Sequence, residues 1–504
     1  MPVDETRTHG SKAFGLGVPI LLALLLLIRL GAMIVVPLMD TTEARYGEIA
    51  RKMAELNDCV TPWFDYGVPY WGKPPLSFWL TAASFDLFGV HEFAARLPHL
   101  AAAFAVIGLV AWMTSRRDPN SVLPAIVILA ASPVFFVIAG AVMTDIELVL
   151  GVTLSMAGFW LAFETQDTSG AVYRPKWLPN LLFFSGLAIG LLAKGPVVVL
   201  LVAFPLFLWT ALNSRWRDVW RGLRWIPGLL LTALVALPWY LAAEQRTPGF
   251  LHYFLIGEHF QRFIEPGWAG DHHGNAHKSP IGAIWVYALA GLLPWSILMP
   301  IAIWRWRKPG TGLAAAFFSS GERQWRSYLL LWAITPLLLF TFARNVSFNY
   351  LLPGMPAAAI WGGQWLAAQA RKGFEINRAL CAGMLITLAV LCTAAVMWSR
   401  PAVYQQKSTG DLLAAYETSL SARGKTAAPL IFVRRRPFSA EFYTRGKALA
   451  AANANEAWSR IGPDAAYVAV IETEVFLSSA AAQKRVIQRI GRYGKFDLLL
   501  VEAR

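Results

Sequence analysis

Long apolar segments separated by short polar connections dominate residues 1–398. Each segment approaches the roughly 20 residues that an α-helix needs to cross the hydrocarbon core of a bilayer. About eleven such segments occur, at roughly residues 14–38, 97–114, 121–140, 146–164, 179–193, 196–212, 225–243, 280–304, 327–342, 351–368 and 378–398. The pattern predicts a polytopic α-helical membrane protein with about eleven spans.

The composition and the distribution of charge agree with this prediction. Hydrophobic residues make up 56% of the 504 positions and charged residues only 15%. In such a chain, the net charge of +14 indicates basic cytoplasmic loops and contacts with membrane lipid, and we expect no nucleic acid partner. Lysine and arginine cluster in alternate connections, as at Arg116, Arg217 and Arg371. The bias of positive loops toward the cytoplasm then places the N-terminus inside and the C-terminus outside.

The first outward connection, from about residue 39 to 96, is long and contains two apolar helical patterns. The first pattern has apolar residues at helical spacing, namely Tyr46, Ile49, Ala50, Met53 and Leu56. Its opposite face carries charged residues, namely Glu48, Arg51, Lys52 and Glu55. The sequence predicts that this helix lies in the membrane interface with its charges toward solvent or headgroups. A second helix is expected from Leu76 to Phe88.

The composition changes after about Arg400, where the apolar segments become short. We expect strands in "PLIFVRR", "AYVAVIE" and "FDLLLVEA", and helices in "GDLLAAYETSLSA" and "SSAAAQKRVIQRI". The chain is therefore predicted to consist of a transmembrane domain over residues 1–398 and a small α/β domain over residues 399–504 on the outer side.

Charged residues from separate outward loops meet at one level of the membrane. Asp40 and Glu43 follow the first apolar segment, and Asp145 is expected at the same depth. The cations Lys73, Lys194, Arg262 and Arg344 lie on outward loops, where the positive-inside bias disfavours them. Acids at helix ends also cap amides, and interface lysines also reach toward headgroups, so these alternatives stay open.

Five of the eight histidines lie between His252 and His277. Imidazole is a good zinc ligand, which makes a divalent metal an option for this loop. The candidate ligands are His259, His272, His273 and His277. Their spacing matches no CxxC or HExxH pattern, and polar loop residues are the alternative.

An ordered series of short motifs resembles a known family. The first loop contains "DTTEARYGEIARKM", "YWGKPPLSFWL" and "FGVHEFAARLP", and later loops contain "MTDIEL", "LAKGP", "EHFQRF", "HKSP" and "YLLPGMP". The series is similar to that of the bacterial lipid A aminoarabinose (4-amino-4-deoxy-L-arabinose) transferases, which are relatives of the protein O-mannosyltransferases. The resemblance implies a GT-C glycosyltransferase of the bacterial inner membrane, with its active site and its C-terminal α/β domain on the periplasmic side.

The resemblance also implies substrates and residue roles. The donor would be an undecaprenyl-phosphate-linked sugar, and the acceptor would be lipid A, lipopolysaccharide core or another glycolipid. The carboxylates expected to take part in catalysis are Asp40, Glu43 and Asp145. The cations expected to bind the donor phosphate are Arg45, Lys73, Arg262 and Lys194. The residues expected to bind the acceptor are Tyr46, Glu258, His259, Arg344 and Tyr350. Gly72 stands where the family often has an acid that is implicated in metal binding.

The same sequence features are compatible with two other functions. A protein O-glycosyltransferase would take the same donor but a protein hydroxyl as acceptor. A transporter or flippase of lipid-linked sugars would place polar residues near the middle of the bilayer. Arg29 is the one charged residue within the first apolar segment, and most other charged residues are expected in loops, which favours an enzyme at the interface.

Overall fold

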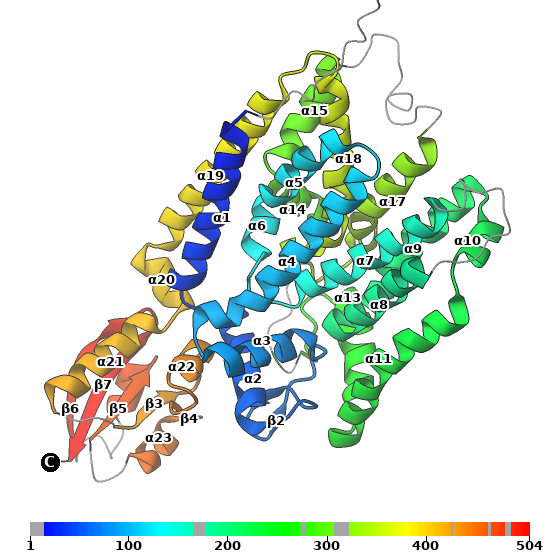
Figure 1. Ribbon diagram of the computed structural model, residues 1–504. Coiled ribbons are helices and arrows are strands. Elements are labelled where there is room, and N and C mark those ends of the chain that lie inside the picture. Colours follow the sequence, from blue (N-terminus) through cyan, green and yellow to red (C-terminus); the bar gives the residue numbers. More distant parts are fainter. Residues whose placement is uncertain are drawn as a thin grey trace, which may run out of the picture.

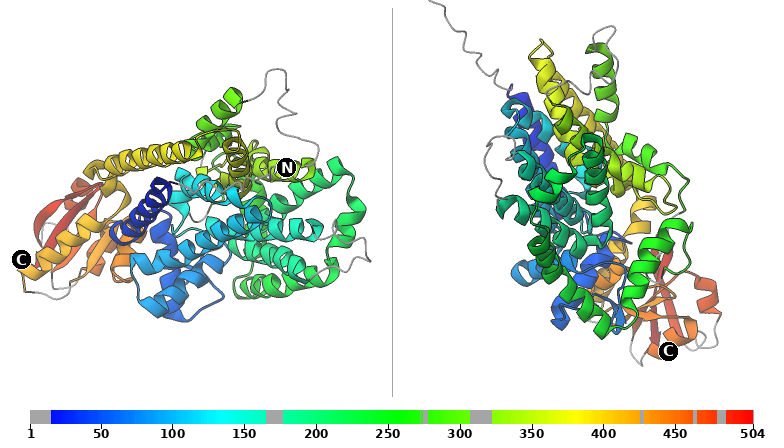
Figure 2. Two further views of the ribbon diagram at one scale, coloured as in Figure 1. Left: turned by 45° about the horizontal axis from the view of Figure 1, so that its top comes forward. Right: turned by 90° about the vertical axis from the view of Figure 1, so that its right-hand side faces the viewer.

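The computed structural model describes residues 15–164, 177–271, 273, 278–306, 322–424, 428–461, 465–478 and 485–503. In this part of the chain, a body of long helices carries a smaller α/β unit at one end (Figure 1). Two further views show the same arrangement (Figure 2).

The apolar segments form the helices of the body. They are α1 (Gly17–Val35), α4 (Glu92–Ser115), η1 (Pro119–Ser121), α5 (Val122–Ala130), α6 (Pro133–Ile138), α7 (Asp145–Glu164), α8 (Trp177–Lys194), α9 (Val197–Asn213), α10 (Trp216–Gly222), α11 (Trp225–Arg246), α14 (Ala283–Gly291), α15 (Trp295–Trp306), α17 (Arg323–Phe340), η3 (Phe348–Gly354), α18 (Met355–Ala370) and α19 (Ile376–Trp398). Each of the eleven predicted segments therefore contains helix, although several segments are broken or short.

Fewer of these helices are long enough to cross a bilayer alone. Among the described residues, six helices meet the length and hydropathy of a span, or seven if α14 and α15, bent by 85° at a short break, form one span. The protein is thus a multi-pass membrane protein, while the count of eleven spans stays a prediction.

Helix α7 forms the centre of the body and packs closely against α8. Gly151 on α7 and Gly186 on α8 make this approach possible, because a Cβ atom at Gly186 would lie 2.5 Å from the carbonyl oxygen of Gly151. Small residues allow two helix backbones to come this close, as in many membrane helix pairs. The helix is fixed by its neighbours, and so is Asp145 at its first turn.

The C-terminal unit, which we define as residues 399–503, contains a five-stranded sheet of order β4-β3-β5-β7-β6. Its strands are β3 (Leu430–Val433), β4 (Leu449–Ala451), β5 (Ala466–Val470), β6 (Arg485–Tyr493) and β7 (Phe496–Ala503). Its helices are α20 (Pro401–Lys407), α21 (Gly410–Ala422), α22 (Phe438–Tyr443), α23 (Ala454–Arg460) and α24 (Thr473–Leu477). Strand β3 runs parallel to β4 and β5, and β7 runs antiparallel to β5 and β6.

Both faces of this sheet are buried. Leu430 and Phe432 face one hydrophobic cluster, which includes α21, and Ile431 and Val433 face the other. The three predicted strands and the α21 helix are confirmed. The helix expected in "SSAAAQKRVIQRI" is wrong at residues 485–490, which belong to the edge strand β6 paired with β7, and residues 479–484 lie outside the described residues. Hydrogen bonding to a neighbouring strand overrides helix propensity there.

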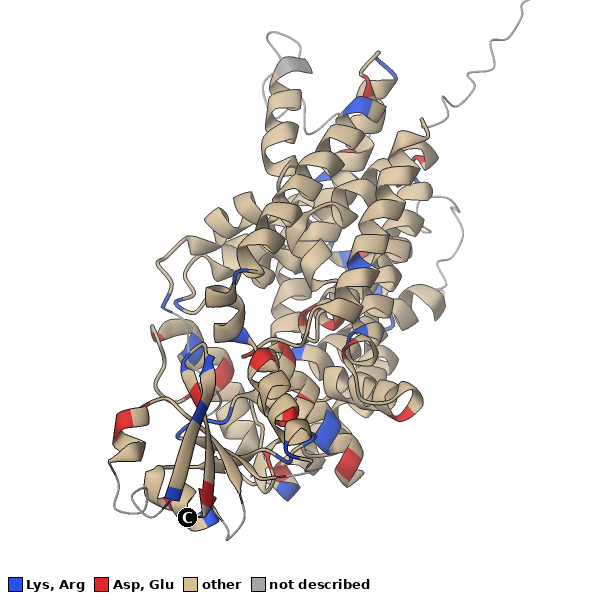
Figure 3. Cartoon of the chain, turned by 90° about the vertical axis from the view of Figure 1, so that its left-hand side faces the viewer, with Lys and Arg blue, Asp and Glu red and all other residues tan. Residues whose placement is uncertain are grey.

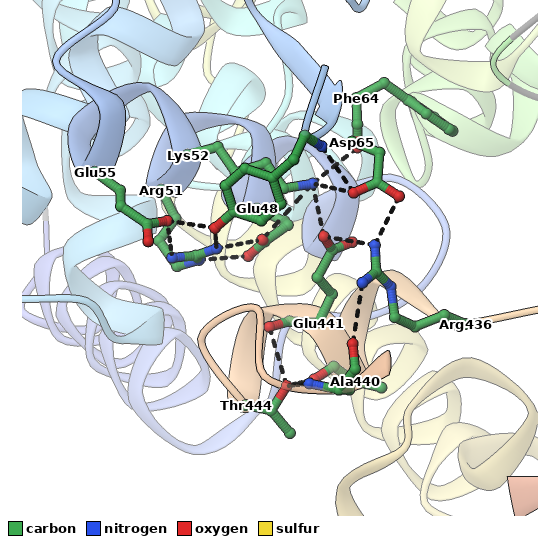
Figure 4. Close-up of polar contacts among 12 residues, drawn as sticks. Glu48, Arg51, Lys52, Glu55, Phe64, Asp65, Arg436, Ala440, Glu441 and Thr444 are labelled. Atoms are coloured by element: carbon green, nitrogen blue, oxygen red, sulfur yellow. Dashed lines mark hydrogen bonds and ion pairs between the residues drawn. The ribbon is translucent and has the colours of Figure 1, made fainter. Parts of the chain in front are cut away.

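The first loop carries α2 (Glu43–Leu56), the short strands β1 (Trp63–Asp65) and β2 (Val68–Pro69), and α3 (Leu76–Phe88). The helices are confirmed, but the expected exposure of the charged face of α2 is wrong for Glu48, Arg51 and Lys52, whereas Glu55 is exposed. Lys52 and Glu48 are fully buried, since this face packs against α22 of the C-terminal unit. Lys52 Nζ lies 2.7 Å from Glu441 Oε1, and Arg436 Nη2 lies 2.8 Å from the same oxygen (Figure 4).

These ion pairs connect the membrane body to the C-terminal unit, whereas the sequence predicted that the charges of α2 would face solvent. Asp65 completes the group, with its Oδ2 atom 2.9 Å from Arg436 Nη2. Figure 3 shows that charged residues gather where the two parts meet, whereas long stretches of the helical body carry few. The pairing is possible only because β1, α2 and α22 come together in the tertiary structure.

Candidate functional site

A cavity of about 1420 Å³ lies where the first loop, the helical body and the C-terminal unit meet. Most residues predicted for the site line it, namely Arg45, Tyr46, Lys73, Asp145, Lys194, Glu258, His259, Arg262, His273 and Tyr350. These residues span about 300 positions of sequence, so the fold alone brings them together.

Glu258 joins two of the predicted phosphate-binding cations. It lies on η2 (Tyr253–Gln261), a π-helical turn between α12 (Phe250–His252) and α13 (Arg262–Ile264). Its carboxylate oxygens lie 3.1 Å from Lys73 Nζ and 2.9 Å from Arg262 Nη1. Burial raises the pKa of Glu258, but the charges of Lys73 and Arg262 outweigh burial and lower the pKa to about 2. The carboxylate is therefore ionised at neutral pH.

Lys194 and Asp145 form a second ion pair in the cavity. Lys194 ends α8, and its ammonium lies 4.8 Å from the ring centroid of Tyr350. Gly195 turns the chain at a φ of +87°, in the left-handed region that favours glycine. A Cβ atom at Gly195 would also lie 2.6 Å from the ring of Phe254. The "LAKGP" motif thus fixes the position from which Lys194 reaches Asp145.

The start of α2 supplies Arg45 and Tyr46. Arg45 donates to the carbonyl oxygen of His273 at 2.6 Å and stacks on the Tyr46 ring at 5.2 Å. The Tyr70 hydroxyl lies 3.4 Å from the Tyr46 hydroxyl. Burial raises the pKa of Tyr46, but nearby Lys73 and Arg45 outweigh it and lower the pKa. The result is a buried tyrosine hydroxyl next to several cations.

Two guanidinium groups in the cavity keep unused hydrogen-bonding capacity. Within the described part of the chain, the Nε atoms of Arg45 and Arg262 are buried without a hydrogen-bond partner. Buried donors are nearly always satisfied, so an orphaned donor in a cavity marks a position for a ligand acceptor. Two such donors from positively charged groups favour an anionic ligand.

Three predicted site residues do not line the cavity. Asp40 accepts hydrogen bonds from the backbone and hydroxyl of Ser439, so it contacts the C-terminal unit, and burial raises its pKa. Glu43, the first residue of α2, binds Arg96 of α4 at 2.7 Å, and Arg96 also donates to the carbonyl oxygen of Val36 just after α1. Arg344 lies between two lining residues, Ala343 and Asn345, and its backbone N–H donates to the carbonyl oxygen of Phe263. The geometry therefore favours Asp145 over Asp40 and Glu43 as the carboxylate that reaches a substrate.

The histidines show no metal centre among the described residues. No three side chains of His, Cys, Asp or Glu in that part of the chain are grouped to hold an ion. His259 is held by the carbonyl oxygens of Phe254 and Lys194, at 2.7 and 3.2 Å. Burial lowers the pKa of His259 below its usual value. His272 and His277 lie outside the described residues.

One wall of the cavity is apolar and another is cationic. The apolar wall comes from the start of α9 and the end of α17, and Leu200 there is 57% exposed on the helical body. The cationic wall comes from Arg434, Arg435 and Arg436, which follow β3. Sequence reasoning missed these arginines, because only the docking of the C-terminal unit brings "RRR" to the loop residues. It also missed Thr41, Thr42, Asp271 and Lys278, which line the cavity.

Comparisons with known proteins agree with this architecture. Residues 15–254 match the family model for dolichyl-phosphate-mannose-protein mannosyltransferase. An undecaprenyl phosphate-alpha-4-amino-4-deoxy-L-arabinose arabinosyl transferase of Edwardsiella ictaluri is 30% identical over 345 residues, which are 66% of this chain and 57% of the relative. The enzyme of the same name from Aeromonas salmonicida is 31% identical over 401 residues, 75% of this chain and 66% of the relative.

The chain belongs to the aminoarabinose transferase family of GT-C glycosyltransferases. A solved structure also has the same fold. The crystal structure of ArnT from Cupriavidus metallidurans bound to undecaprenyl phosphate has a TM-score of 0.76 and 18% identity, and covers 96% of this chain and 97% of that one. The chain nevertheless spans only about 57% of the first aminoarabinose transferase it matches.

Proposed function

We propose that this protein is a glycosyltransferase that moves a sugar from undecaprenyl phosphate to lipid A. The reaction would take place at the periplasmic face of the bacterial inner membrane, and the C-terminal unit would lie on that side. The observation that carries the proposal is the pair of orphaned guanidinium donors, on Arg45 and Arg262, in a cavity with an apolar wall. An anionic group on a lipid chain satisfies both features at once.

The apolar wall is suited to the polyprenyl tail of the donor. Leu200 and Val199 on α9 are 57% and 44% exposed, so this wall reaches the lipid-facing surface of the helical body. The cations Lys73, Arg262 and Arg45 line the same cavity and would hold the donor phosphate. Their charges stabilise the undecaprenyl phosphate as it leaves the sugar.

Transfer breaks the bond between the sugar C1 atom and the phosphate oxygen, and an acceptor oxygen forms the new bond to C1. Asp145 is the carboxylate that we assign to this step. It would orient the acceptor and stabilise positive charge at C1, with the ion pair to Lys194 fixing its rotamer. If the acceptor group is a phosphate, it is already ionised and needs no strong base.

The experiment is mass spectrometry of lipid A from strains with and without the gene, complemented by variants. Asp145→Asn should reduce transfer by about a hundredfold or more, because the change removes the charge and keeps the shape. Asp40→Asn is the matched comparison, and we expect a much smaller effect, since Asp40 contacts Ser439 outside the cavity. Unmodified lipid A in the complemented strain would disprove the proposal. A larger loss with Asp40→Asn would move the catalytic role to Asp40.

A further inference from the structure

The C-terminal unit contributes three consecutive arginines to the cavity wall. Arg434, Arg435 and Arg436 begin directly after β3. The parallel strands β4 and β5 flank β3 on both sides, so this loop leaves the carboxyl end of an inner strand. In α/β sheets, ligands bind outside the carboxyl ends of parallel strands. The loop thus combines a usual ligand-binding position with a concentration of positive charge.

Contacts at both ends hold the loop in one shape. Arg434 has a φ of 71°, which residues other than glycine rarely adopt, and its backbone N–H donates to the carbonyl oxygen of Ala451 at 2.7 Å. The Arg436 side chain is fully engaged by Asp65 at 2.9 Å, Glu441 at 2.8 Å and the carbonyl oxygen of Ala448 at 3.0 Å. Arg436 therefore anchors the loop, and Arg434 and Arg435 carry the exposed side chains.

These two arginines have charge available for a ligand. Arg435 forms no ion pair with any carboxylate in the described ranges, and its field acts on Asp40, whose oxygens Ser439 already occupies. Arg434 pairs with Glu472 at the protein surface, where both side chains are about half exposed. Exposed ion pairs contribute little, so this one is easily exchanged. Among the described residues of the wall, eight lysines and arginines face five carboxylates.

We propose that Arg434 and Arg435 form an acceptor subsite that binds a phosphate monoester on the lipid acceptor. The inference rests on the proposed function, in which Lys73, Arg262 and Arg45 hold the donor phosphate. A donor and an acceptor that both carry phosphate repel each other, so one cavity needs a separate cationic group for each. Guanidinium groups match phosphate oxygens with two parallel hydrogen bonds. Arg434 and Arg435 line the same cavity as Asp145, Lys194 and the apolar wall.

The test measures lipid binding by the full-length protein in phosphatidylcholine nanodiscs. The probes are lipid A with its phosphates and lipid A from which the phosphates have been removed enzymatically. We expect wild type to prefer the phosphorylated probe. The double variant Arg434→Ala, Arg435→Ala should lose about ten- to a hundredfold in affinity for that probe and nothing for the other. Donor affinity should not change. Arg460→Ala, an exposed arginine of the same unit outside the cavity wall, is the matched control.

Three results would overturn the subsite. The first is equal binding of the two probes by wild type, and the second is an unchanged preference in the double variant. The third is competition by phosphatidylglycerol as strong as by phosphorylated lipid A, which would assign the arginines to ordinary membrane headgroups. Failure of the proposed function gives a different result, namely no sugar transfer from the undecaprenyl donor while the binding preference is intact.

Discussion

At the scale of single residues, ion pairs decide how much positive charge a ligand meets. Glu258 is shared by Lys73 and Arg262, so the three side chains together carry one net positive charge. With a pKa of about 2, Glu258 keeps this arrangement throughout the neutral range. Under the proposed function, Glu258 would hold the two long cationic side chains in place before the donor binds, which would lower the entropic cost of binding.

Lys73→Ala should raise the KM for the polyprenyl-phosphate donor by about ten- to a hundredfold, because a charge-assisted contact to phosphate contributes about 1.5–3 kcal/mol. Arg262→Ala should behave similarly, and Arg262→Lys should recover only part of the loss, since an ammonium lacks the guanidinium fork. The measurement is transfer rate against donor concentration in nanodiscs.

The control for this series is Lys447→Ala, an exposed lysine of the C-terminal unit that does not line the cavity. Lys52, which the sequence suggests as a solvated control, is unsuitable because it is buried among carboxylates. Similar donor KM values for Lys73→Ala and Lys447→Ala would remove Lys73 from the phosphate site.

At the scale of elements, helix α2 has two functions on two parts of its surface. Its first turns present Arg45 and Tyr46 to the cavity, while Lys52, two turns later, binds Glu441 of α22. Phe442 of α22 packs into the same hydrophobic cluster as Ile49 and Met53. The position of the C-terminal unit is thereby coupled to the position of the site residues on α2.

Lys52→Ala should destabilise the protein by about 1–3 kcal/mol, because it removes one of the two cations that bind the buried Glu441 and leaves only Arg436. The readouts are the Tm in detergent and the rate at which protease removes the C-terminal unit. Replacing both partners, as Lys52→Met with Glu441→Gln, should restore part of the loss, since no uncompensated charge remains from this pair. A Tm for Lys52→Ala equal to that of wild type would show that this cluster does not hold the two parts together.

At the scale of the whole molecule, the arrangement of α1 and α19 helps to show which parts of the protein share one side of the membrane. The two helices lie side by side, and both end near the C-terminal unit (Figure 1). The basic connections lie at the other end of the body, where Arg371 binds Asp118 at 2.8 Å and Arg116 binds Glu164 at 2.8 Å. Loops that the charge pattern assigns to one side of the membrane are thus neighbours in space.

Reporter fusions check this orientation. A fusion after Arg217 should report the cytoplasm, and a fusion after Arg400 should report the periplasm, because positive loops are retained inside. Cytoplasmic activity of both fusions would place the cavity and the C-terminal unit on the wrong side for a lipid-linked donor that is used in the periplasm.

The sequence by itself determined the helical membrane body, the α/β character of the C-terminal unit and most of the polar residues that were expected together and line the cavity. The length and periodicity of apolar segments depend only on local sequence. Lysines and arginines on outward loops can be recognised because they run against the positive-inside bias. The edge strand β6 could not be read in this way, because its conformation depends on pairing with β7.

Only the tertiary structure decided which charged residues face the cavity and which ones hold the fold together. Local sequence does not distinguish Asp40, Glu43 and Lys52 from Arg45 and Asp145, because all five are charged residues expected near the same membrane level. The first three nevertheless bind Ser439, Arg96 and Glu441, respectively. A charged side chain is stabilised by whichever opposite charge or hydrogen bond lies nearest in space, and these partners are distant in sequence. For the same reason, the place of Arg434 and Arg435 at the cavity followed only from the docking of the C-terminal unit.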